Sequence, residues 1–585
     1  MIARRCLSRL LLVGLLLPVG FGGAARAAVD GPLGAALDRY LGALVAYGYS
    51  GAALVAQHGK VLLDQGYGLA DRARGVPFTA DTLFDIASIS KPFTAAAVLR
   101  LEMQGKLRVD DPLSRFFPAA PPDKAGITLH QLLTHTAGLP ESLGEEYEPL
   151  GRDAFLKRLF STPLVHPPGR RFLYSNAGYS LLAAVVEVVS GRPFGEFLRT
   201  EIFAPAGMRH TGFLPEAADR ARLAHGYTLE GDWGTSLDHP IAPDGPFWNL
   251  RGNGGLLTTT GDLYRWHVAL QGDSVLSAAE RQKYQRPYVP ETHAAHPRYA
   301  YGWSVSPGPD GKRMLAHVGS NGVFQADFRR YPDDDAVIVT VTNSTASSAI
   351  AVADQLERRL FARPHGDPPA VAALPEAALR RCAGTYALPS GEPLAVAVEA
   401  GRLAVTPAGS DGLALLGGAE AAHGRRFAER DRQIGDSLTA ARRGELGPLA
   451  EALGTSPALA TARWHTLLAA GEKALGAWQG ESVLGTVSQA GRVVTYARLA
   501  FARGTRVLEA IWAGPTAESL SLGPALRPTF FLPEPAGRFA TYDVGTDAIV
   551  RLECVGAGDS ASALRVQGAA GTSTLPRRTA SDAPR

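Results

Sequence analysis

Three short motifs, separated by long stretches of sequence, constrain the fold of this chain most strongly. In order they are Ser88-Ile89-Ser90-Lys91, Tyr174-Ser175-Asn176 and His317-Val318-Gly319. Each motif alone is a weak signal. Together they supply the residue types of an acyl-transfer site, so we expect a fold that brings all three side by side.

The first motif supplies a nucleophile and a base. Ser88 and Lys91 are three residues apart, so on a helix they share one face and the amine can reach the hydroxyl. A serine hydroxyl is a weak nucleophile at neutral pH until a neighbouring base takes its proton. Lysine can be that base only if burial or a cationic neighbour lowers its pKa. Pro92 suits the first turn of the helix that follows, which predicts Ser88 at a helix start.

The other two motifs supply groups that can move protons or hold a substrate. Tyr174 offers a phenolic proton carrier, and the amide of Asn176 can hold Lys91 or a substrate carbonyl. The third motif is predicted at the end of an edge strand, where Gly319 lets the backbone approach a ligand. His317, which begins this motif, is a further candidate catalytic residue. We expect His135 to tie a turn rather than to take part in the chemistry.

The N-terminus predicts export. Arg4, Arg5 and Arg9 precede an apolar run over 10–21, and Ala25-Arg26-Ala27 follows it. This pattern is typical of a signal peptide over residues 1–27, cleaved before Ala28. The alternative, an uncleaved anchor helix, is disfavoured because the run is short for a membrane span. No later segment is apolar for long enough to cross a membrane, so we expect a periplasmic or secreted protein.

Charge and cysteine content exclude several classes of partner and cofactor. The formal net charge is +3 over 585 residues and there is no basic stripe, so we expect no nucleic-acid partner. Once the signal peptide is removed, Cys382 and Cys554 are the remaining cysteines and are predicted to form a disulfide in an oxidising compartment. Neither has histidine or acidic neighbours at metal-like spacing, so we expect no metal and no other cofactor.

The length of the chain requires more than one domain. Strand and helix patterns predict an α+β domain over 28–362, with an antiparallel sheet flanked by helices, and Pro364, Pro368 and Pro369 mark a linker. Beyond it we expect a small β-barrel, with short strands over 386–416, interrupted by an inserted α+β unit. Cys382 and Cys554 are expected at the first and last strands of this barrel. The predicted bounds are 363–375 for the linker, 376–424 and 526–570 for the barrel, 425–525 for the insertion and 571–585 for a disordered tail.

Residues 30–362 resemble the class C β-lactamase branch of the penicillin-binding superfamily, which includes D-alanyl-D-alanine carboxypeptidases, D-aminopeptidases and family VIII esterases. The resemblance is carried by the three motifs together with Phe84-Asp85-Ile86-Ala87 before the first of them and Leu132-Leu133-Thr134-His135-Thr136-Ala137-Gly138-Leu139. It implies a β-lactamase/DD-peptidase-like domain with a helical subdomain. The C-terminal barrel resembles barrels appended to some of these hydrolases, and the insertion resembles a cone-shaped, SnoaL-like unit.

The resemblance also implies a role for each motif residue. Ser88 is the nucleophile that forms an acyl-enzyme, Lys91 is its proton partner and Tyr174 is a general base, while Asn176 orients Lys91 and the substrate. The oxyanion hole consists of the backbone N–H groups of Ser88 and of Ser320, which follows Gly319. Whether Lys91 or Tyr174 takes the proton stays open at this point.

One departure from the family pattern bears on the substrate. Relatives that bind the carboxylate of a β-lactam or of a terminal D-alanine usually carry threonine or serine in the middle of the third motif. Val318 has no hydroxyl, and His317 replaces a lysine. A site without a donor for a desolvated carboxylate binds such substrates poorly.

We therefore predict an exported serine hydrolase of small esters, amides or D-amino-acid peptides. A β-lactamase or D-alanyl-D-alanine carboxypeptidase is one alternative, and a non-catalytic penicillin-binding or sensor protein is another. The sequence does not fix the oligomeric state.

Overall fold

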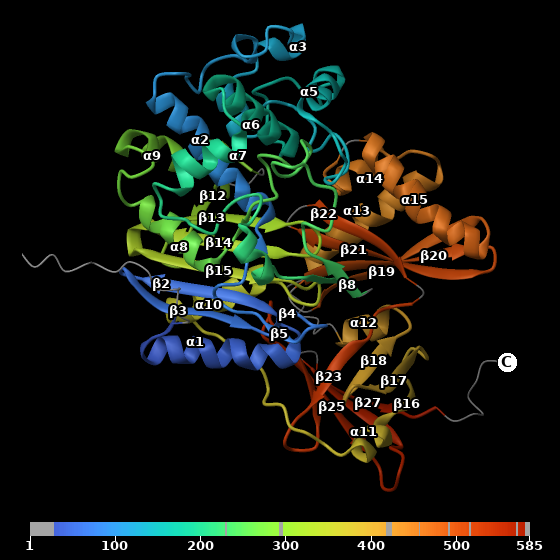
Figure 1. Cartoon of the computed structure of the whole chain (residues 1–585). Coiled ribbons are helices and arrows are strands. Elements are labelled where there is room, and N and C mark those ends of the chain that lie inside the picture. Colours follow the sequence, from blue (N-terminus) through green and yellow to red (C-terminus); the bar gives the residue numbers. More distant parts are fainter. Residues whose placement is uncertain are drawn as a thin grey trace, which may run out of the picture.

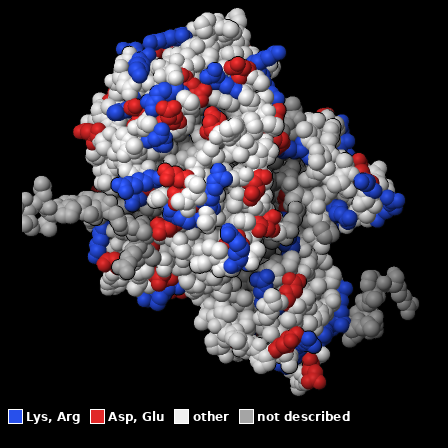
Figure 2. Space-filling view, in the orientation of Figure 1, with Lys and Arg blue, Asp and Glu red and all other residues white. Residues whose placement is uncertain are grey.

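A computed structural model describes most of the chain after the predicted signal peptide (Figure 1). The described residues are 28–228, 231–291, 296–416, 424–455, 457–489, 492–513, 516–523, 525–568 and 571–578. The signal peptide predicted over 1–27 lies outside them. Among the described residues, no helix is long and apolar enough to span a bilayer. On the face drawn in Figure 2, acidic and basic side chains are interspersed.

The first domain is built on a nine-stranded antiparallel sheet. Its order is β1 (Ala28–Val29), β3 (Lys60–Tyr67), β2 (Gly51–Gln57), β15 (Ala336–Thr342), β14 (Gln325–Tyr331), β13 (Arg313–Ser320), β12 (Ser304–Pro307), β11 (Arg298–Tyr299) and β10 (Val289–Pro290). The central strands β14 and β15 are buried along their whole length. Alternate residues of a strand point to opposite faces, so both faces of the sheet must be covered by other elements.

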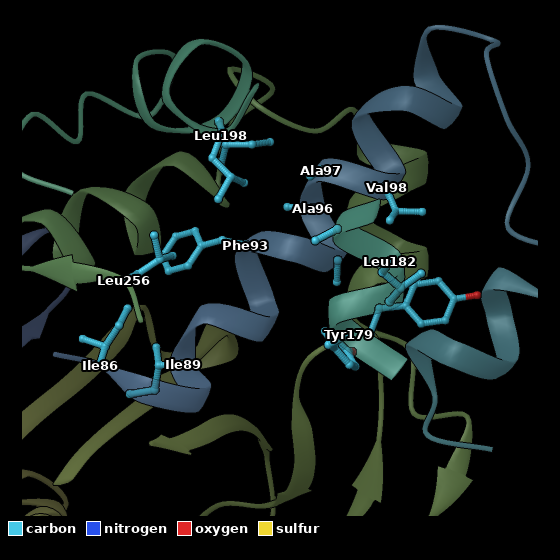
Figure 3. Packing of buried hydrophobic residues seen from close by; sticks show 14 of the residues in the cluster. Ile86, Ile89, Phe93, Ala96, Ala97, Val98, Tyr179, Leu182, Leu198 and Leu256 are labelled. Atoms are coloured by element: carbon cyan, nitrogen blue, oxygen red, sulfur yellow. The ribbon is translucent and has the colours of Figure 1, made fainter. Parts of the chain in front are cut away.

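Helices cover both faces of this sheet. One face carries α1 (Gly31–Leu44) and α10 (Ala349–Leu360), whose apolar side chains pack on alternate residues of β2 and β15. The larger core on the other face contains α2 (Ser90–Met103), α6 (Asn176–Ser190) and α8 (Thr260–Ala269). Figure 3 shows α2 running through this core, with small alanines close to α6 and Phe93 toward Leu198 and Leu256.

The remaining elements of this domain are short. They are α3 (Pro122–Ala125), α4 (Leu129–Leu133), α5 (Arg152–Ser161), α7 (Phe194–Phe197), α9 (Ala278–Gln285) and the strand pairs β4 (Leu69–Asp71) with β5 (Val76–Pro77), β6 (Phe84–Asp85) with β9 (Leu257–Thr258), and β7 (Gly226–Thr228) with β8 (Gly231–Gly234). Residues 363–375 contain no helix or strand.

The C-terminal barrel is a nearly closed eight-stranded sheet. Its order is β16 (Gly384–Ala387), β17 (Pro393–Glu399), β18 (Arg402–Pro407), β23 (Thr529–Pro533), β24 (Phe539–Asp543), β25 (Ala548–Val555), β26 (Ala563–Gly568) and β27 (Gly571–Pro576). A bridge between Tyr386 and Arg577 brings the first and last strands together. Two helices accompany the barrel, α11 (Glu376–Cys382) and α12 (Ser410–Leu416), the second where a strand was expected.

The prediction of a disordered tail from residue 571 is wrong for the residues that the structure describes. β27 pairs with β26 along its whole length and buries Leu575 completely. Leu575 is the single large apolar side chain in this strand. The strand is held largely by backbone pairing, which leaves little hydrophobic signal in the sequence.

A disulfide joins Cys382 and Cys554, with 5.5 Å between their Cα atoms. Cys382 ends α11 and Cys554 lies in β25, so the link does not join the first and last strands of the barrel as expected. It closes a loop that contains the whole insertion. Such a cross-link contributes about 2–5 kcal/mol to stability.

The insertion folds as its own α+β unit between β18 and β23. Its elements are α13 (Gly424–Arg442), α14 (Gly447–Ala452), α15 (Pro457–Leu475) and a four-stranded sheet of β19 (Trp478–Gln489), β20 (Arg492–Phe501), β21 (Gly504–Ala513) and β22 (Thr516–Gly523). The helices pack on one face of the sheet around Trp464 and Leu499. In Figure 1 this unit, in orange, lies beside the first domain, and the barrel lies below both.

Direct bonds fix both C-terminal units to the first domain. The barrel is held on α10, where Gln355 donates to the carbonyl of Val544 at 3.1 Å and Arg358 pairs with Asp547 at 3.0 Å. The inserted unit is held by Arg492, which donates to the carbonyl of Ser347.

Candidate active site

The turn that carries Ser88 is held by a buried carboxylate. Ser88 lies in a short 3-10 turn over Ala87–Ile89 that leads directly into α2. Ala87 has a φ of +43°, which a residue with a side chain adopts only when its surroundings enforce it. Asp85 accepts the backbone N–H of Ala87 at 2.7 Å and the hydroxyl of Ser236 at 2.7 Å. This carboxylate therefore fixes the backbone just before Ser88.

Lys91 is completely buried and donates three hydrogen bonds to neutral oxygens. Its Nζ lies 2.9 Å from Ser88 Oγ, 2.7 Å from Asn176 Oδ1 and 3.1 Å from the carbonyl oxygen of Asn253. Burial lowers the pKa of Lys91 to about 7, and the charges of Glu141 and Glu146 oppose this shift. At neutral pH a large share of Lys91 is thus the free amine, which can accept the proton of Ser88.

The third acceptor of Lys91 comes from a glycine-rich turn. Gly252 has a φ of +86°, and a Cβ there would lie 2.8 Å from the carbonyl oxygen of Tyr179 on α6. Only glycine fits this close approach, and it places the next carbonyl, that of Asn253, on Lys91. Gly252, Gly254 and Gly255 form a pattern typical of a shaped backbone turn, but the pattern does not single out Asn253 as the acceptor.

Tyr174 stands immediately before α6 and faces the same serine. Burial raises the pKa of its phenol well above the ordinary value, and a hydrogen bond with Ser88 opposes the shift. The Nζ of Lys91 lies 4.7 Å from the centre of the Tyr174 ring. Because the phenol keeps its proton, Tyr174 is suited to donate it, and Lys91 is the better group to accept the proton of Ser88.

The second motif is held in place through Ser175, the N-cap of α6. Ser175 Oγ accepts the N–H of Gly178 at 3.0 Å and donates to the carbonyl of Pro140 at 2.7 Å. The N–H of Ser175 donates to Nδ1 of His135 at 2.9 Å, and the ring of His135 lies 4.4 Å from that of Tyr174. His135 therefore positions the motif, in agreement with the prediction that it ties a turn.

Gly319 brings the third motif against the Ser88 turn. A Cβ on Gly319 would lie 2.0 Å from the carbonyl oxygen of Ile86 and 3.1 Å from the backbone nitrogen of Ser88, so no larger residue fits. The backbone of Gly319 thus lies beside the N–H of Ser88, and Ser320 is the next residue along the strand.

β13 was expected to be an edge strand, and it is one only in part. Its first half is interior, because Arg313–Ala316 pair with β12. Among the described residues no strand covers the same side of His317–Ser320, so the sheet opens there beside the Ser88 turn.

Comparison with known proteins identifies the family. The model of the family described as "Beta-lactamase" matches residues 37–363, more than half of the chain. The chain belongs to the beta-lactamase family. It is a serine hydrolase of the β-lactamase fold, as the resemblance in the sequence implies.

Several relatives of this beta-lactamase family member are known. "Penicillin-binding protein 4*" of Bacillus subtilis (strain 168) is 28% identical over 398 residues, which is 64% of this chain and 87% of that protein. "Esterase EstB" of Burkholderia gladioli is 40% identical over 188 residues, 29% of this chain and 48% of the esterase. An octameric penicillin-binding protein homologue from Pyrococcus abyssi shares the fold, with a TM-score of 0.53 at 20% identity over 92% of this chain and 99% of that one.

His317 occupies the lysine position of the family's third motif and is neutral. Its Nδ1 donates to the carbonyl of Val318 at 2.8 Å, because a carbonyl only accepts, and its Nε2 therefore accepts from the hydroxyl of Tyr299 at 3.1 Å. Burial lowers the pKa of His317 to about 3, and the charge of Lys91 lowers it further. Both ring nitrogens are occupied, so we assign His317 no proton-transfer step.

Two carboxylates near Lys91 were not predicted from the sequence. Burial raises the pKa of Glu141 to about 8 and that of Glu146 to about 7, while the charge of Lys91 opposes both shifts. They lie in the irregular segment between α4 and α5, which has neither periodicity nor a motif to single them out. At neutral pH Glu141 is therefore mostly protonated and Glu146 is partly ionised.

Proposed function

We propose that this protein is exported and hydrolyses small esters, amides or D-amino-acid peptides through an acyl-enzyme on Ser88. The observation that carries the proposal is the 2.9 Å bond between Ser88 Oγ and the buried Lys91, whose pKa burial lowers to about 7. Export rests on the pattern of residues 1–27 alone.

The geometry supports a two-step mechanism. Lys91 accepts the proton of Ser88 as Oγ bonds to the carbonyl carbon, and the N–H groups of Ser88 and Ser320 stabilise the oxyanion. The C–O or C–N bond to the leaving group then breaks, and the leaving group takes a proton from protonated Lys91, either directly or from Tyr174, which Lys91 then reprotonates. Lys91 is thereby returned to its free amine. Water repeats the sequence on the acyl-enzyme, with Lys91 as the base, and releases the acid and free Ser88.

Two features favour substrates without a free carboxylate beside the scissile bond. Val318 offers no hydroxyl to such a carboxylate, and the neutral His317 stands where relatives carry a charged lysine. Binding an anion there leaves a hydrogen bond unmet and gains no charge attraction. These features argue against the β-lactamase and D-alanyl-D-alanine carboxypeptidase alternative.

The alternative of a non-catalytic penicillin-binding or sensor protein is disfavoured, because all the proton-transfer groups of the site are present and bonded to one another. Lys91 bonds both Ser88 and Asn176, and Tyr174 bonds Ser88. A protein that only binds a ligand has no need for this set of proton-transfer groups.

The substrate preference is tested by exchanging Val318. We expect the wild type to hydrolyse short-chain nitrophenyl esters faster than nitrocefin. Val318→Thr is expected to raise the nitrocefin-to-ester ratio of kcat/KM about tenfold, because one transition-state hydrogen bond contributes about 1.4 kcal/mol. Val318→Ala, which changes the size without adding a hydroxyl, is the control and should leave the ratio near the wild-type value. A wild-type nitrocefin rate that equals its best ester rate would contradict the preference.

A further inference from the structure

Residues 140–146, here called the bridging segment, are bonded to the second catalytic motif. The carbonyl of Pro140 accepts the hydroxyl of Ser175, and the carbonyl of Glu141 accepts the N–H of Ala177 at 3.0 Å. Both donors belong to the first turn of α6, which carries Tyr174 and Asn176 into the site. The position of the bridging segment therefore sets the position of this motif.

The other side of the bridging segment is held by the inserted unit. Ser142 and Thr455 share a hydroxyl hydrogen bond at 3.4 Å, and Arg463 of α15 pairs with Glu145 at 3.3 Å. Gly454, in the turn after α14, packs directly on the Glu141 side chain, because a Cβ on Gly454 would lie 2.7 Å from Glu141 Oε2. A unit that begins more than 270 residues after the bridging segment thus touches it at three places.

Charge links the same residues. The positive charge of Arg463 lowers the pKa of Glu141, and the negative charge of Glu141 raises that of Lys91. The other groups that face this pair are Glu146, which also raises the pKa of both, and the neutral His135, His317 and Tyr174. The inserted unit therefore influences the proton acceptor of the reaction through one intervening carboxylate.

We propose that the inserted unit is part of the active-site wall, with Gly454 and Arg463 as positioning residues that fix Glu141 and, through the bridging segment, Tyr174 and Asn176. This inference rests on the proposed function. The inserted unit then contributes to catalysis, because it affects both kcat and the pH at which Lys91 loses its proton.

A matched pair of glycine variants tests the contact. Gly454 and Gly444 both have a positive φ, +60° and +82°, but a Cβ on Gly444 meets nothing within 4 Å. The backbone strain of an alanine is therefore similar in both. Only in Gly454→Ala does the added Cβ meet other side chains, Glu141 Oε2 at 2.7 Å and Thr516 Cγ2 at 3.0 Å. We expect Gly454→Ala to lower kcat for an ester at least fivefold with KM little changed. Gly444→Ala, which carries the backbone strain alone, should keep the wild-type kcat.

A second pair tests the charge. Arg463→Gln removes the cation that stabilises ionised Glu141, so less negative charge remains beside Lys91 and the pKa of Lys91 falls. The acid limb of the pH profile of kcat/KM is therefore expected to move to lower pH. Glu141→Gln should cause a shift in the same direction, and Arg463→Gln should add nothing to it. Arg443, which pairs with Glu445 at 3.3 Å on the surface of the same unit, provides the control, and Arg443→Gln should leave the limb in place.

The outcomes separate this inference from the proposed function. If Gly454→Ala matches Gly444→Ala and Arg463→Gln matches Arg443→Gln while the wild type turns over esters, the inserted unit has no part in the active site. If the wild type itself hydrolyses no ester or amide and Ser88 resists acylation, the proposed function is overturned instead.

Discussion

Ser88→Ala is expected to lower kcat for an ester substrate by about 10⁴- to 10⁶-fold, the cost of removing a nucleophile that acts together with its base. The fold should persist, because Ser88 lies on the turn before α2 and its hydroxyl is bonded within the site rather than to the core. Steady-state kinetics with a nitrophenyl ester and circular dichroism measure the two effects together.

Ser90 provides the matched control for this substitution. It is the other serine of the first motif, is buried, and its hydroxyl accepts the N–H of Leu256 instead of facing Lys91. Ser90→Ala is expected to retain most of the wild-type turnover. If Ser88→Ala retained turnover comparable to that of Ser90→Ala, Ser88 would not be the nucleophile.

Lys91→Met is expected to lower kcat by about 10²- to 10⁴-fold, the usual contribution of a positioned general base. The methionine fills the apolar part of the lysine site but cannot accept the proton of Ser88. In the Ser88→Ala background the same exchange should have little further effect, because the two residues act as one unit. If the double variant lost kcat by the product of the two single decreases, Ser88 and Lys91 would not share one proton transfer.

The same variant is expected to change how stability depends on pH. Because the pKa of Lys91 is lowered to about 7 in the folded protein, the unfolded chain binds more protons between about pH 7 and 10. The free energy of unfolding of the wild type therefore gains a contribution that rises by up to about 1.4 kcal/mol per pH unit in this window. Glu141 and Glu146 are retained in Lys91→Met, and their pKa values rise when the charge of Lys91 is lost, so comparing the two proteins reports Lys91 together with these coupled carboxylates.

Denaturant unfolding at pH 7 and pH 9 measures this difference. From pH 7 to pH 9 the wild type should gain about 2–3 kcal/mol relative to Lys91→Met. Equal pH dependence of the two proteins would show that Lys91 is not held in its low-pKa environment.

The sequence predicted the central architecture because it rests on local patterns. The apolar runs of β14 and β15 and the helix after Ser88 are each visible in a short window, and the three motifs mark where those elements converge. The insertion was also visible, as a change from short strands to a charged helical stretch near residue 424.

Other parts depend on contacts between distant segments and left no local signal. β27 joins the barrel sheet by pairing with β26. The carbonyl of Asn253 reaches Lys91 because Gly252 lies close to α6. Glu141 owes its environment to Lys91 on one side and to Gly454 on the other, which are far apart in the chain. Tertiary packing decides all three, and a single sequence does not record it.

Intact-mass analysis after treatment with a fluorophosphonate probe tests whether Ser88 is the nucleophile. We expect one adduct per chain on the wild type, formed on Ser88 because Lys91 accepts its proton. The adduct should be absent from Ser88→Ala and present on Ser90→Ala. An adduct that persists on Ser88→Ala, or a wild-type protein that stays unlabelled under conditions that leave it folded, would contradict this assignment.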